Sequence, residues 1–423
     1  MPISTLSKAA EQAAWSLDQW LAYLSEIHPS NIELGLERVM QVYQHLNLDL
    51  SRKIVVTVAG TNGKGTTCAM LEQALLLQGK TVAVFSSPHL LDYRERVRVQ
   101  GKMLSPEAHC AAFMQVEAAR QAISLTYFEF GTLQALLLMA DSQAEYLILE
   151  VGLGGRLDAV NIVDPNIAVI TSIDLDHQEW LGDNREAIAR EKAGIFRAGI
   201  PAIVGEPEPP KTLLEAADKL AVKAHWQGQE FQYQVSDGKF SWRNKDFSFE
   251  ALSLPLIPAQ NASTALQVLA SMAMPLNHDF VEQLFSQTQL AGRRQIIQQQ
   301  PTIMLDVAHN PHATRLLAAD IAQQSYGRVI AVVGMLADKD IQHSLEPLLT
   351  QVDCWHCASL SVPRGAASEQ LVCVLSQAEM VLEFASVTAA YVAAVELAQK
   401  DDLILVFGSF YTVAEVMTHV EAN

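Results

Sequence analysis

A glycine-rich segment that contains one lysine is the strongest candidate for chemistry in this sequence. Residues 60–67 read Gly-Thr-Asn-Gly-Lys-Gly-Thr-Thr, between the apolar run Ile54–Ala59 and a helical pattern from Thr66 to Gln78. Glycines let backbone N–H groups turn toward phosphate oxygens, and the N-terminus of a following helix favours negative charge. Lys64 is spaced to reach the β and γ phosphates of a nucleotide. The segment therefore predicts a phosphate-binding loop.

Two positions of this loop depart from the strict P-loop pattern. Val58 stands where the pattern has its first glycine, and Gly65 follows the lysine in place of a hydroxyl residue. Thr66 is therefore the hydroxyl expected beside magnesium. The nucleotide is not expected to be guanine, because the nearest base-reading segment, residues 244–247, has Phe247 where an acid is needed.

Three more polar side chains follow apolar runs. Ser87, Glu150 and His177 stand near the carboxyl ends of expected strands, and open α/β sheets bind their ligands at that edge. Mg²⁺ prefers hard oxygen ligands, which suits Ser87 and Glu150, whereas His177 is a less usual ligand. Each also has an ordinary interpretation, as a residue before a proline, a strand end or a loop histidine. Their shared position beside the phosphate loop favours a magnesium site.

Charged residues further along could support this site. Asp174 and Asp176 lie in the loop after the strand that ends near residue 173, where they either assist the metal or are simply solvated. Lys192 lies on an expected amphipathic helix. Its ordinary interpretation is one end of a helix-surface charge pair, with Arg190 and Glu191 nearby.

The elements that must position these residues alternate between strands and helices, which predicts α/β layering around parallel sheets. Strands are expected over 54–59, 81–86, 146–151 and 167–173, and again over 302–307, 328–335, 352–358, 380–384 and 403–409. Short alternating segments from 226 to 254 predict a small antiparallel excursion. We therefore predict a doubly wound P-loop ATPase-type sheet domain over 1–294, a polar linker over 295–300, and a smaller Rossmann-like α/β domain over 301–423.

The composition restricts the partners of the chain. The 29 Lys and Arg against 47 Asp and Glu give a formal charge of −18, which disfavours nonspecific attraction to nucleic acid or to an anionic membrane. The start has no basic stretch followed by an apolar segment, and no run of about 20 apolar residues occurs. Five scattered cysteines give no disulfide framework. A cytoplasmic protein is expected, with Cys354 and Cys357 packed in a strand because no further metal ligands accompany them.

Four motifs in a fixed order make the sequence resemble a known family. They are Thr57–Thr66, Ser86–Leu90, Glu150–Asp158 and Asp306–Pro311, within a likeness that runs from about Trp20 to Val413. Together they are similar to those of the bacterial bifunctional dihydrofolate synthase/folylpolyglutamate synthases, a Mur ligase-like family. In that family Gly65 after the lysine is typical.

The resemblance implies an ATP- and Mg²⁺-dependent ligase that joins L-glutamate to 7,8-dihydropteroate, and to tetrahydrofolate and its polyglutamates, through an acyl phosphate. Shielding that intermediate from water would explain two domains. It implies a site made of the following residues: Thr61, Asn62, Gly63, Lys64, Gly65, Thr66, Asn261, Arg293 and Asp306 for ATP; Thr66, Ser87, Glu150 and His177 for metal; Lys64, a carbamylated Lys192 and His309, which helps to place the incoming glutamate, for catalysis; and Glu33, Leu34, Gly35, Leu36, Thr126, Tyr127, Phe128, Glu129, Leu157, Asp158 and Ala159 for the acceptor. Because Arg294 adjoins Arg293, the arginine that contacts the nucleotide is left open.

The acceptor segment also has a physical rationale. Tyr127 and Phe128 offer flat apolar faces, and Glu129 offers an acceptor for pterin N–H groups. The alternative is that the two aromatic residues belong to the core.

Two rival functions are retained. A Mur-type amino-acid ligase shares the acyl-phosphate chemistry, but such enzymes carry a separate nucleotide-sugar domain before the phosphate loop, and only 59 residues precede Gly60. A noncatalytic nucleotide-binding switch would require neither the acceptor segments nor Asp306 and His309. A monomer that binds only small-molecule substrates is expected.

Overall fold

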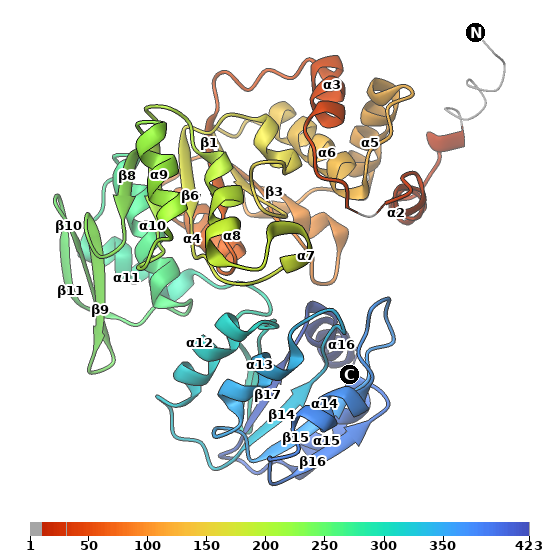
Figure 1. The fold of residues 1–423 in the computed structure, drawn as a ribbon, viewed down its shortest axis with the longest axis vertical. Coiled ribbons are helices and arrows are strands. Elements are labelled where there is room, and N and C mark those ends of the chain that lie inside the picture. The colour runs from red at the N-terminus through yellow and green to blue at the C-terminus, as the bar shows by residue number, and fades with distance from the viewer. Residues whose placement is uncertain (1–10, 31, 423) are drawn as a thin grey trace. The chain divides into compact units, whose positions relative to one another are not determined.

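The computed structural model describes residues 11–30 and 32–422, and the chain divides into two compact units between Thr288 and Gln289 (Figure 1). Both units have an α/β architecture with largely parallel sheets, so the predicted fold class is confirmed. The division lies upstream of the linker that was expected over 295–300. Among the described residues, none of the helices is both long enough and apolar enough to cross a bilayer.

Unit 1 is built on an eight-stranded sheet in the order β4-β3-β2-β5-β1-β6-β7-β8. Its strands are β1 (Ile54–Ala59), β2 (Val82–Phe85), β3 (Val97–Val99), β4 (Lys102–Met103), β5 (Tyr146–Glu150), β6 (Ile167–Ile170), β7 (Pro201–Val204) and β8 (Lys223–Trp226). From β2 to β8 the neighbours are parallel, whereas β3 pairs antiparallel with β2 and the edge strand β4 pairs antiparallel with β3. The central strands are buried on both faces, which explains their continuous apolar sequences.

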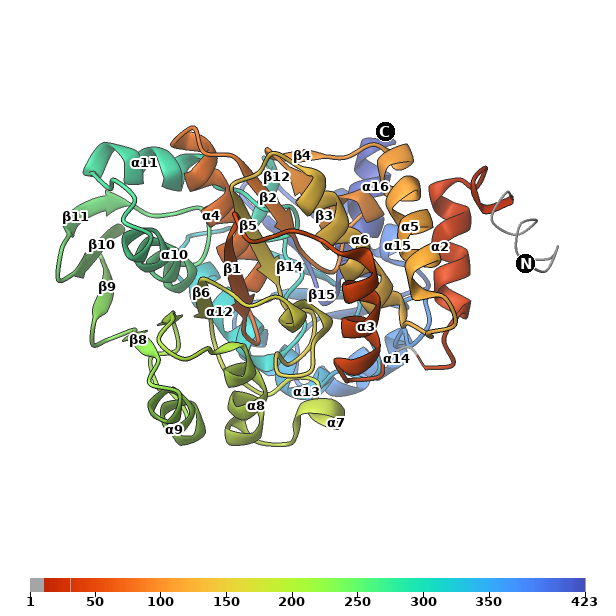
Figure 2. The same cartoon turned by 90° about the horizontal axis from the view of Figure 1, so that it is seen from above.

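Helices cover both faces of this sheet (Figure 2). One face packs on α2 (Leu17–Glu26), α3 (Glu37–Leu46), α5 (Pro106–Arg120), α6 (Tyr127–Asp141), α8 (Arg185–Lys192) and α9 (Lys211–Lys219). The other packs on α4 (Lys64–Leu77), α10 (Ala259–Ser271) and α11 (His278–Gln287), and on a three-stranded antiparallel sheet of β9 (Phe231–Ser236), β10 (Lys239–Asn244) and β11 (Ser248–Ser253). This small sheet confirms the antiparallel excursion predicted between 226 and 254.

Side-chain caps fix the starts of α6 and α8, two helices of unit 1 that carry predicted site residues. Asn184 accepts a hydrogen bond from the N–H of Ala187 (2.9 Å) and thereby begins α8, the helix that ends at Lys192. Thr126 and Glu129 form a capping box at the start of α6. Capping oxygens satisfy backbone N–H groups that the first helical turn leaves unpaired.

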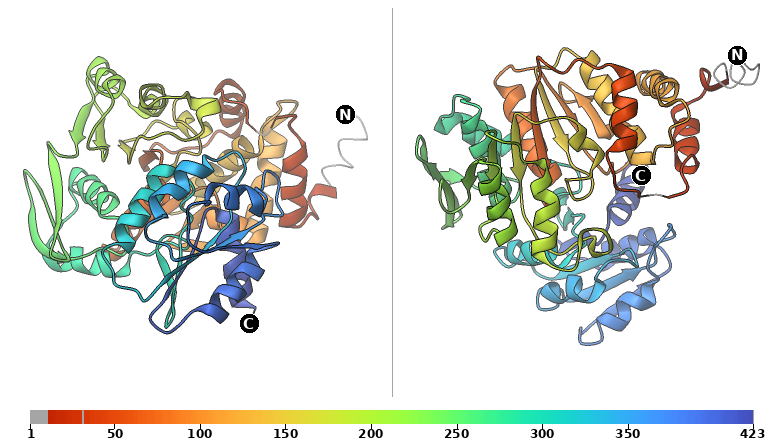
Figure 3. Two further views of the ribbon diagram at one scale, coloured as in Figure 1. Left: turned by 60° about the horizontal axis from the view of Figure 1, so that its bottom comes forward. Right: turned by 45° about the horizontal axis from the view of Figure 1, so that its top comes forward.

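Unit 2 has a six-stranded sheet in the order β12-β13-β17-β14-β15-β16. The strands are β12 (Gln295–Gln299), β13 (Thr302–Leu305), β14 (Val329–Val333), β15 (Cys354–Ala358), β16 (Val381–Phe384) and β17 (Leu403–Phe407), parallel except for β12. The helices are α12 (Pro311–Ile321), α13 (Ile341–Leu345), α14 (Ser368–Val374), α15 (Val387–Leu397) and α16 (Phe410–Glu421), and Figure 3 shows them around the blue sheet. Cys354 and Cys357 are buried in β15, as predicted, and burial raises the pKa of the Cys357 thiol to about 12.

The linker prediction is wrong in its local structure. Residues 295–299 form β12, antiparallel to β13, where a polar connection was expected. An edge strand is open to solvent on one side, so β12 tolerates glutamines at positions 295, 298 and 299 around Ile296 and Ile297. Polarity alone therefore misidentified a strand as a linker.

Candidate active site

The carboxyl ends of four neighbouring parallel strands meet at one edge of the unit 1 sheet. β2 leads to Ser87, β5 ends at Glu150, β1 leads into the phosphate loop, and β6 leads into residues 171–177. Because β2, β5, β1 and β6 are adjacent in that order, the structure brings these sequence-predicted segments to a common edge. This is the edge at which α/β sheets bind ligands.

The phosphate loop fits tightly against its neighbours. A Cβ atom on Gly60 would lie 1.9 Å from Thr171 Oγ1, and one on Gly63 would lie 2.0 Å from Asn261 Nδ2. Gly63 also has φ +81°, a conformation that L side chains rarely adopt. Asn261 Nδ2 donates to the carbonyl of Gly63 at 3.4 Å. The structure thus places Asn261 directly on the loop.

Lys64 points back over the loop from the first turn of α4. Its Nζ donates to the carbonyl oxygens of Gly60 (3.0 Å) and Thr61 (3.3 Å). The ammonium group and the N-terminus of α4 therefore add positive potential at the same place, which suits a phosphate group.

The loop after β6 is hydrogen-bonded to the phosphate loop. Thr61 N–H donates to the carbonyl of Ser172 (2.8 Å), and Asn62 N–H donates to Ser172 Oγ (3.1 Å). Thr61 Oγ1 donates to the carbonyl of Asp174 (2.9 Å) and accepts from its N–H (3.0 Å). If either loop moved, the hydrogen bonds that join the two loops would break.

The proposed metal ligands lie at the end of β5, after β2, after β6 and on α4. Glu150 is buried, and its Oε2 accepts a hydrogen bond from the N–H of Ser87 at 3.2 Å. Thr66 is buried in the first turn of α4, whereas the His177 side chain is 45% exposed, at the N-cap of α7 (Gln178–Leu181). Residues 11–30 and 32–422 contain no cluster of three or more His, Cys, Asp or Glu side chains that could hold a metal ion by themselves. Two hydroxyls and one carboxylate suit Mg²⁺, which keeps waters and phosphate oxygens in its shell, whereas the imidazole of His177 is a less usual ligand.

Lys192 is buried, with 3% of its surface exposed. Burial, and then the charge of Lys64, lower the pKa of its amine to about 7, although Asp176 and Asp158 act in the opposite direction. Its neighbour Glu191 pairs instead with Arg156 (2.9 Å). The surface charge-pair interpretation of Lys192 is therefore wrong.

Three acceptor segments come together in what we call the acceptor wall, residues 33–36, 126–129 and 157–159. They stand at the starts of α3, α6 and the 3₁₀-helix η2 (Ala159–Ile162), and these three elements pack on one another. Arg38 joins the first two segments, because its guanidinium pairs with Glu33 and also with Glu129 (2.9 Å). Asp158 is buried, and its carboxylate accepts from the N–H groups of Leu153 (2.8 Å) and Val160 (3.0 Å).

The Glu129 carboxylate has hydrogen-bond partners within the protein, where pterin N–H groups were expected. It is buried and accepts from the N–H of Thr126 (2.8 Å) and from Arg38. The oxygens that were expected to receive pterin N–H groups thus already hold the helix start and the wall together. The pattern Thr126-x-x-Glu129 before an apolar run was a sequence signal for this capping box.

The two aromatic residues of the wall are half-buried, so neither is simply a core residue. Phe128 lies against the motif after β5, since a Cβ on Gly152 would be 2.4 Å from Phe128 Cζ. The Arg96 guanidinium lies 5.4 Å from the ring centroid of Tyr127, and Arg96 Nε donates to His89 Nδ1 (2.8 Å). Sequence reasoning missed both Arg96 and Arg38, because no local pattern reveals which aromatic ring or carboxylate a lone arginine reaches.

The predicted residues of unit 2 form a second group. Arg293 lies over the ring of Phe410, 4.9 Å from its centroid, and His309 lies beside the same ring at 6.2 Å between centroids. The guanidinium of Arg294 instead pairs with Asp320 on α12. Asp306 is buried and accepts from the N–H groups of Arg294 (2.9 Å) and Ala308 (2.8 Å), and burial raises the pKa of its carboxyl group.

Comparison with protein families finds the Mur ligase middle domain over residues 58–272 and the Mur ligase glutamate ligase domain over residues 292–410. The chain is 49% identical over 417 residues to the dihydrofolate synthase/folylpolyglutamate synthase of Escherichia coli K12, with 98% of each chain covered. The structure of E. coli FolC in complex with DHPP and ADP matches with a TM-score of 0.93 and 49% identity, over 97% of this chain and 99% of that chain. The Yersinia pestis bifunctional enzyme complexed with AMPPNP and Mn ion matches with a TM-score of 0.92 and 48% identity, over the same shares.

The two matched domains, together with the phosphate loop, define the class as an ATP-dependent ligase of the Mur type. Within that class, the chain belongs to the dihydrofolate synthase/folylpolyglutamate synthase family. It is thus an acid–amino acid ligase with the two activities of that name, which confirms the predicted function.

Proposed function

We propose that the residues identified above carry this ligase activity, with unit 1 binding ATP, metal and acceptor, and unit 2 contributing contacts to the nucleotide and to L-glutamate. The observation that carries the proposal is the meeting of the phosphate loop, Ser87 and Glu150 at one edge of the sheet, with the buried Lys192 close enough for the charge of Lys64 to lower its pKa. Relatives of known structure hold ADP with DHPP, or AMPPNP with Mn. The acceptors are 7,8-dihydropteroate, tetrahydrofolate and its polyglutamates.

The reaction has two steps. A carboxylate oxygen of the acceptor attacks the γ-phosphorus of ATP, and the bond between that phosphorus and the oxygen that bridges it to the β-phosphate breaks. ADP departs, and the acceptor is now an acyl phosphate. The amine of L-glutamate then attacks the acyl carbon, phosphate departs from the tetrahedral intermediate, and the amine proton passes to solvent. Lys64 and the N-terminus of α4 stabilise charge on the transferring phosphoryl group. Mg²⁺, held by Thr66, Ser87, Glu150 and His177, would add positive charge at the phosphate oxygens.

Lys192 is proposed to carry a carbamate. Its neutral amine attacks CO₂, a nitrogen–carbon bond forms, and one proton is released. Burial supports this step because it keeps a fraction of the amine neutral near pH 7. The product would replace a cation with carbamate oxygens that can bind Mg²⁺ or accept hydrogen bonds from its waters.

In the acceptor wall, the ring faces of Tyr127 and Phe128 are proposed to contact the pterin. The remaining segment residues, Glu33, Leu34, Gly35, Leu36, Thr126, Leu157 and Ala159, line or shape the pocket. Glu129 and Asp158 are assigned to shaping, since their carboxylates bind backbone N–H groups of the wall itself.

The nucleotide is proposed to be held by Thr61 to Thr66, Asn261, Arg293 and Asp306. Arg293 is preferred over Arg294 because Arg294 pairs with Asp320. His309 is proposed to help place L-glutamate. A monomer, a cytoplasmic location, and the absence of nucleic-acid and membrane partners remain predictions.

Release of ADP from the purified chain tests this function. ADP and phosphate should appear only when dihydropteroate or a reduced folate is present, and product should form only when L-glutamate is added as well. Equal ATP hydrolysis without an acceptor would contradict ligation and favour a nucleotide-binding switch. Turnover with a cell-wall nucleotide-sugar acceptor in place of a folate would favour the Mur-type rival.

A further inference from the structure

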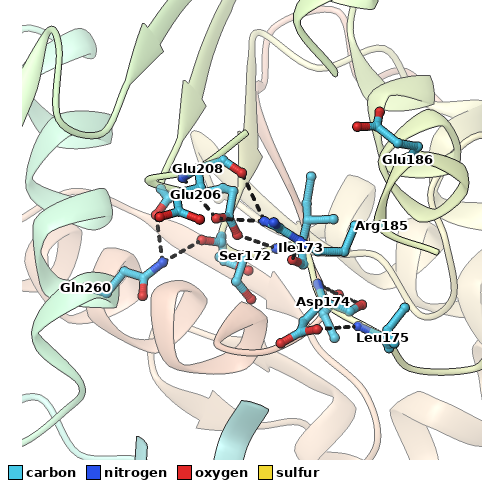
Figure 4. A network of polar contacts seen from close by, with 12 residues as sticks. Ser172, Ile173, Asp174, Leu175, Arg185, Glu186, Glu206, Glu208 and Gln260 are labelled. Carbon is cyan, nitrogen blue, oxygen red and sulfur yellow. Dashed lines mark hydrogen bonds and ion pairs between the residues drawn. The ribbon is translucent and has the colours of Figure 1, made fainter. Parts of the chain in front are cut away.

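A buried carboxylate two residues after β7 has no part in the site described so far. Glu206 is 6% exposed, and its Oε2 accepts a hydrogen bond from the N–H of Ile173 at 2.8 Å. Its Oε1 accepts from the N–H of Glu208 (3.1 Å) and pairs with Arg185 Nη2 at 3.0 Å. Figure 4 shows these groups together.

Arg185 also binds the backbone of Ile173. Its Nε donates to the carbonyl of Ile173 (2.9 Å), and its Nη2 donates to the carbonyl of Glu208 (2.9 Å). Glu206 and Arg185 therefore hold the N–H and the carbonyl of Ile173 at once. We call this pair with its bonds to Ile173 the Arg185–Glu206 clamp.

The clamp lies between the loop that binds the phosphate loop and the helix that carries Lys192. On its far side, the neighbouring residues Ser172 and Asp174 bind the phosphate loop through Thr61. Arg185 itself begins α8, and that helix ends at Lys192. One pair thus spans the loop that leads to His177 and the helix that carries Lys192.

A role in stability alone does not account for such a pair. Burying the Glu206 carboxylate costs free energy that its attraction to the partly exposed Arg185 only partly returns, so the pair adds little net stability. The pair instead fixes the orientation of the backbone groups that it binds, because a carboxylate accepts and a guanidinium donates hydrogen bonds at defined angles.

We propose that Arg185 and Glu206 are positioning residues that fix the 172–177 loop, so that it meets the phosphate loop and presents His177 toward the metal. Without the clamp, the loop samples other positions, and metal and nucleotide bind more weakly while the sites for acceptor and L-glutamate stay intact. This inference rests on the assignment of His177 to the metal.

Glu206→Gln tests the clamp, because glutamine keeps the size of the side chain and loses its charge. Amide hydrogen exchange at Ile173 should become about 10-fold faster, since its N–H loses a charged acceptor. At saturating acceptor and L-glutamate, the Mg²⁺ concentration that gives half-maximal rate should rise about 5-fold or more, with KM for L-glutamate within about 2-fold of its starting value. Calorimetry should show weaker MgADP binding.

Glu186→Gln is the matched control. Glu186 adjoins Arg185, but its carboxylate accepts from the N–H groups of Lys211 (3.1 Å) and Thr212 (2.8 Å) at the start of α9. This variant should keep the Ile173 exchange rate and the Mg²⁺ dependence of the unchanged protein. Arg185→Gln, at a side chain that is 38% exposed, should reproduce the effect of Glu206→Gln if that variant fails to fold.

Unchanged Ile173 exchange and unchanged Mg²⁺ dependence in a folded clamp variant would overturn the proposal. So would an equal rise in KM for Mg²⁺, acceptor and L-glutamate, because that pattern indicates general loosening. Exchange and MgADP affinity are measured without turnover, so they judge the clamp even if the unchanged protein shows no folate ligase activity.

Discussion

The phosphate loop and the acceptor wall both belong to unit 1, yet they are held in different ways. Glycines that leave no room for a Cβ, and hydrogen bonds that mostly involve backbone groups, fix the phosphate loop. The acceptor wall depends on side chains, above all on Arg38 between Glu33 and Glu129. Backbone geometry is dictated by nearby sequence, whereas a side-chain bridge depends on where distant segments arrive. Changes in the loop should therefore affect nucleotide chemistry, and changes in the wall should affect acceptor binding.

The largest effect is expected from Lys64→Ala. Turnover should fall by about 100-fold or more, because the transferring phosphoryl group loses a charge partner. ADP release measures this, and a circular-dichroism melt should show an unchanged fold. Lys211→Ala removes a lysine whose side chain is 81% exposed and should leave turnover unchanged. Near-normal turnover in folded Lys64→Ala would contradict the phosphate-loop assignment.

Lys192→Ala should lose most of the activity and regain part of it when acetate is supplied, because acetate restores carboxylate oxygens beside the metal. In the unchanged protein, activity at fixed dissolved CO₂ should decline as the pH falls through about 7, since protonation removes the neutral amine that forms the carbamate. The acetate-rescued variant should lack this decline. A crystal grown with bicarbonate and Mg²⁺ that shows an unmodified amine would refute the carbamate.

Gly63→Ala should weaken nucleotide binding by about 10-fold, because the new methyl group meets Asn261 and the backbone keeps a positive φ. Calorimetry with MgADP measures the affinity. Gly238→Ala is the control, since Gly238 also has a positive φ (+67°) but no atom within 4 Å of the added Cβ. If both variants lost the same affinity, the contact with Asn261 would not be the cause.

Arg38→Met should raise KM for dihydropteroate by about 5-fold while KM for ATP stays unchanged, because only the acceptor wall loses its bridge. Arg94→Met, which removes a local pair with Asp92 (2.6 Å), should leave both constants unchanged. An equal change in both constants for Arg38→Met would mean that the wall and the phosphate loop are one cooperative unit.

The sequence alone predicted the local structure of the phosphate loop and most of the strands of the two sheets. Strand, glycine turn, lysine and helix are consecutive between Ile54 and Leu77, so their conformations follow from neighbouring residues. The alternation of strands and helices along the chain also predicted two α/β units. It did not reveal β12, because glutamines on the open side of an edge strand have the same polarity as a linker.

The tertiary structure alone decided which side chains meet. Glu129 was expected to face the pterin, but folding turns its carboxylate toward Thr126 and Arg38. Lys192 was compatible with a surface pair until the packing of α8 buried it and lowered the pKa of its amine. Motifs report backbone conformations set over a few residues, whereas burial and charge pairing depend on segments far apart in the chain, so only the folded structure fixes them.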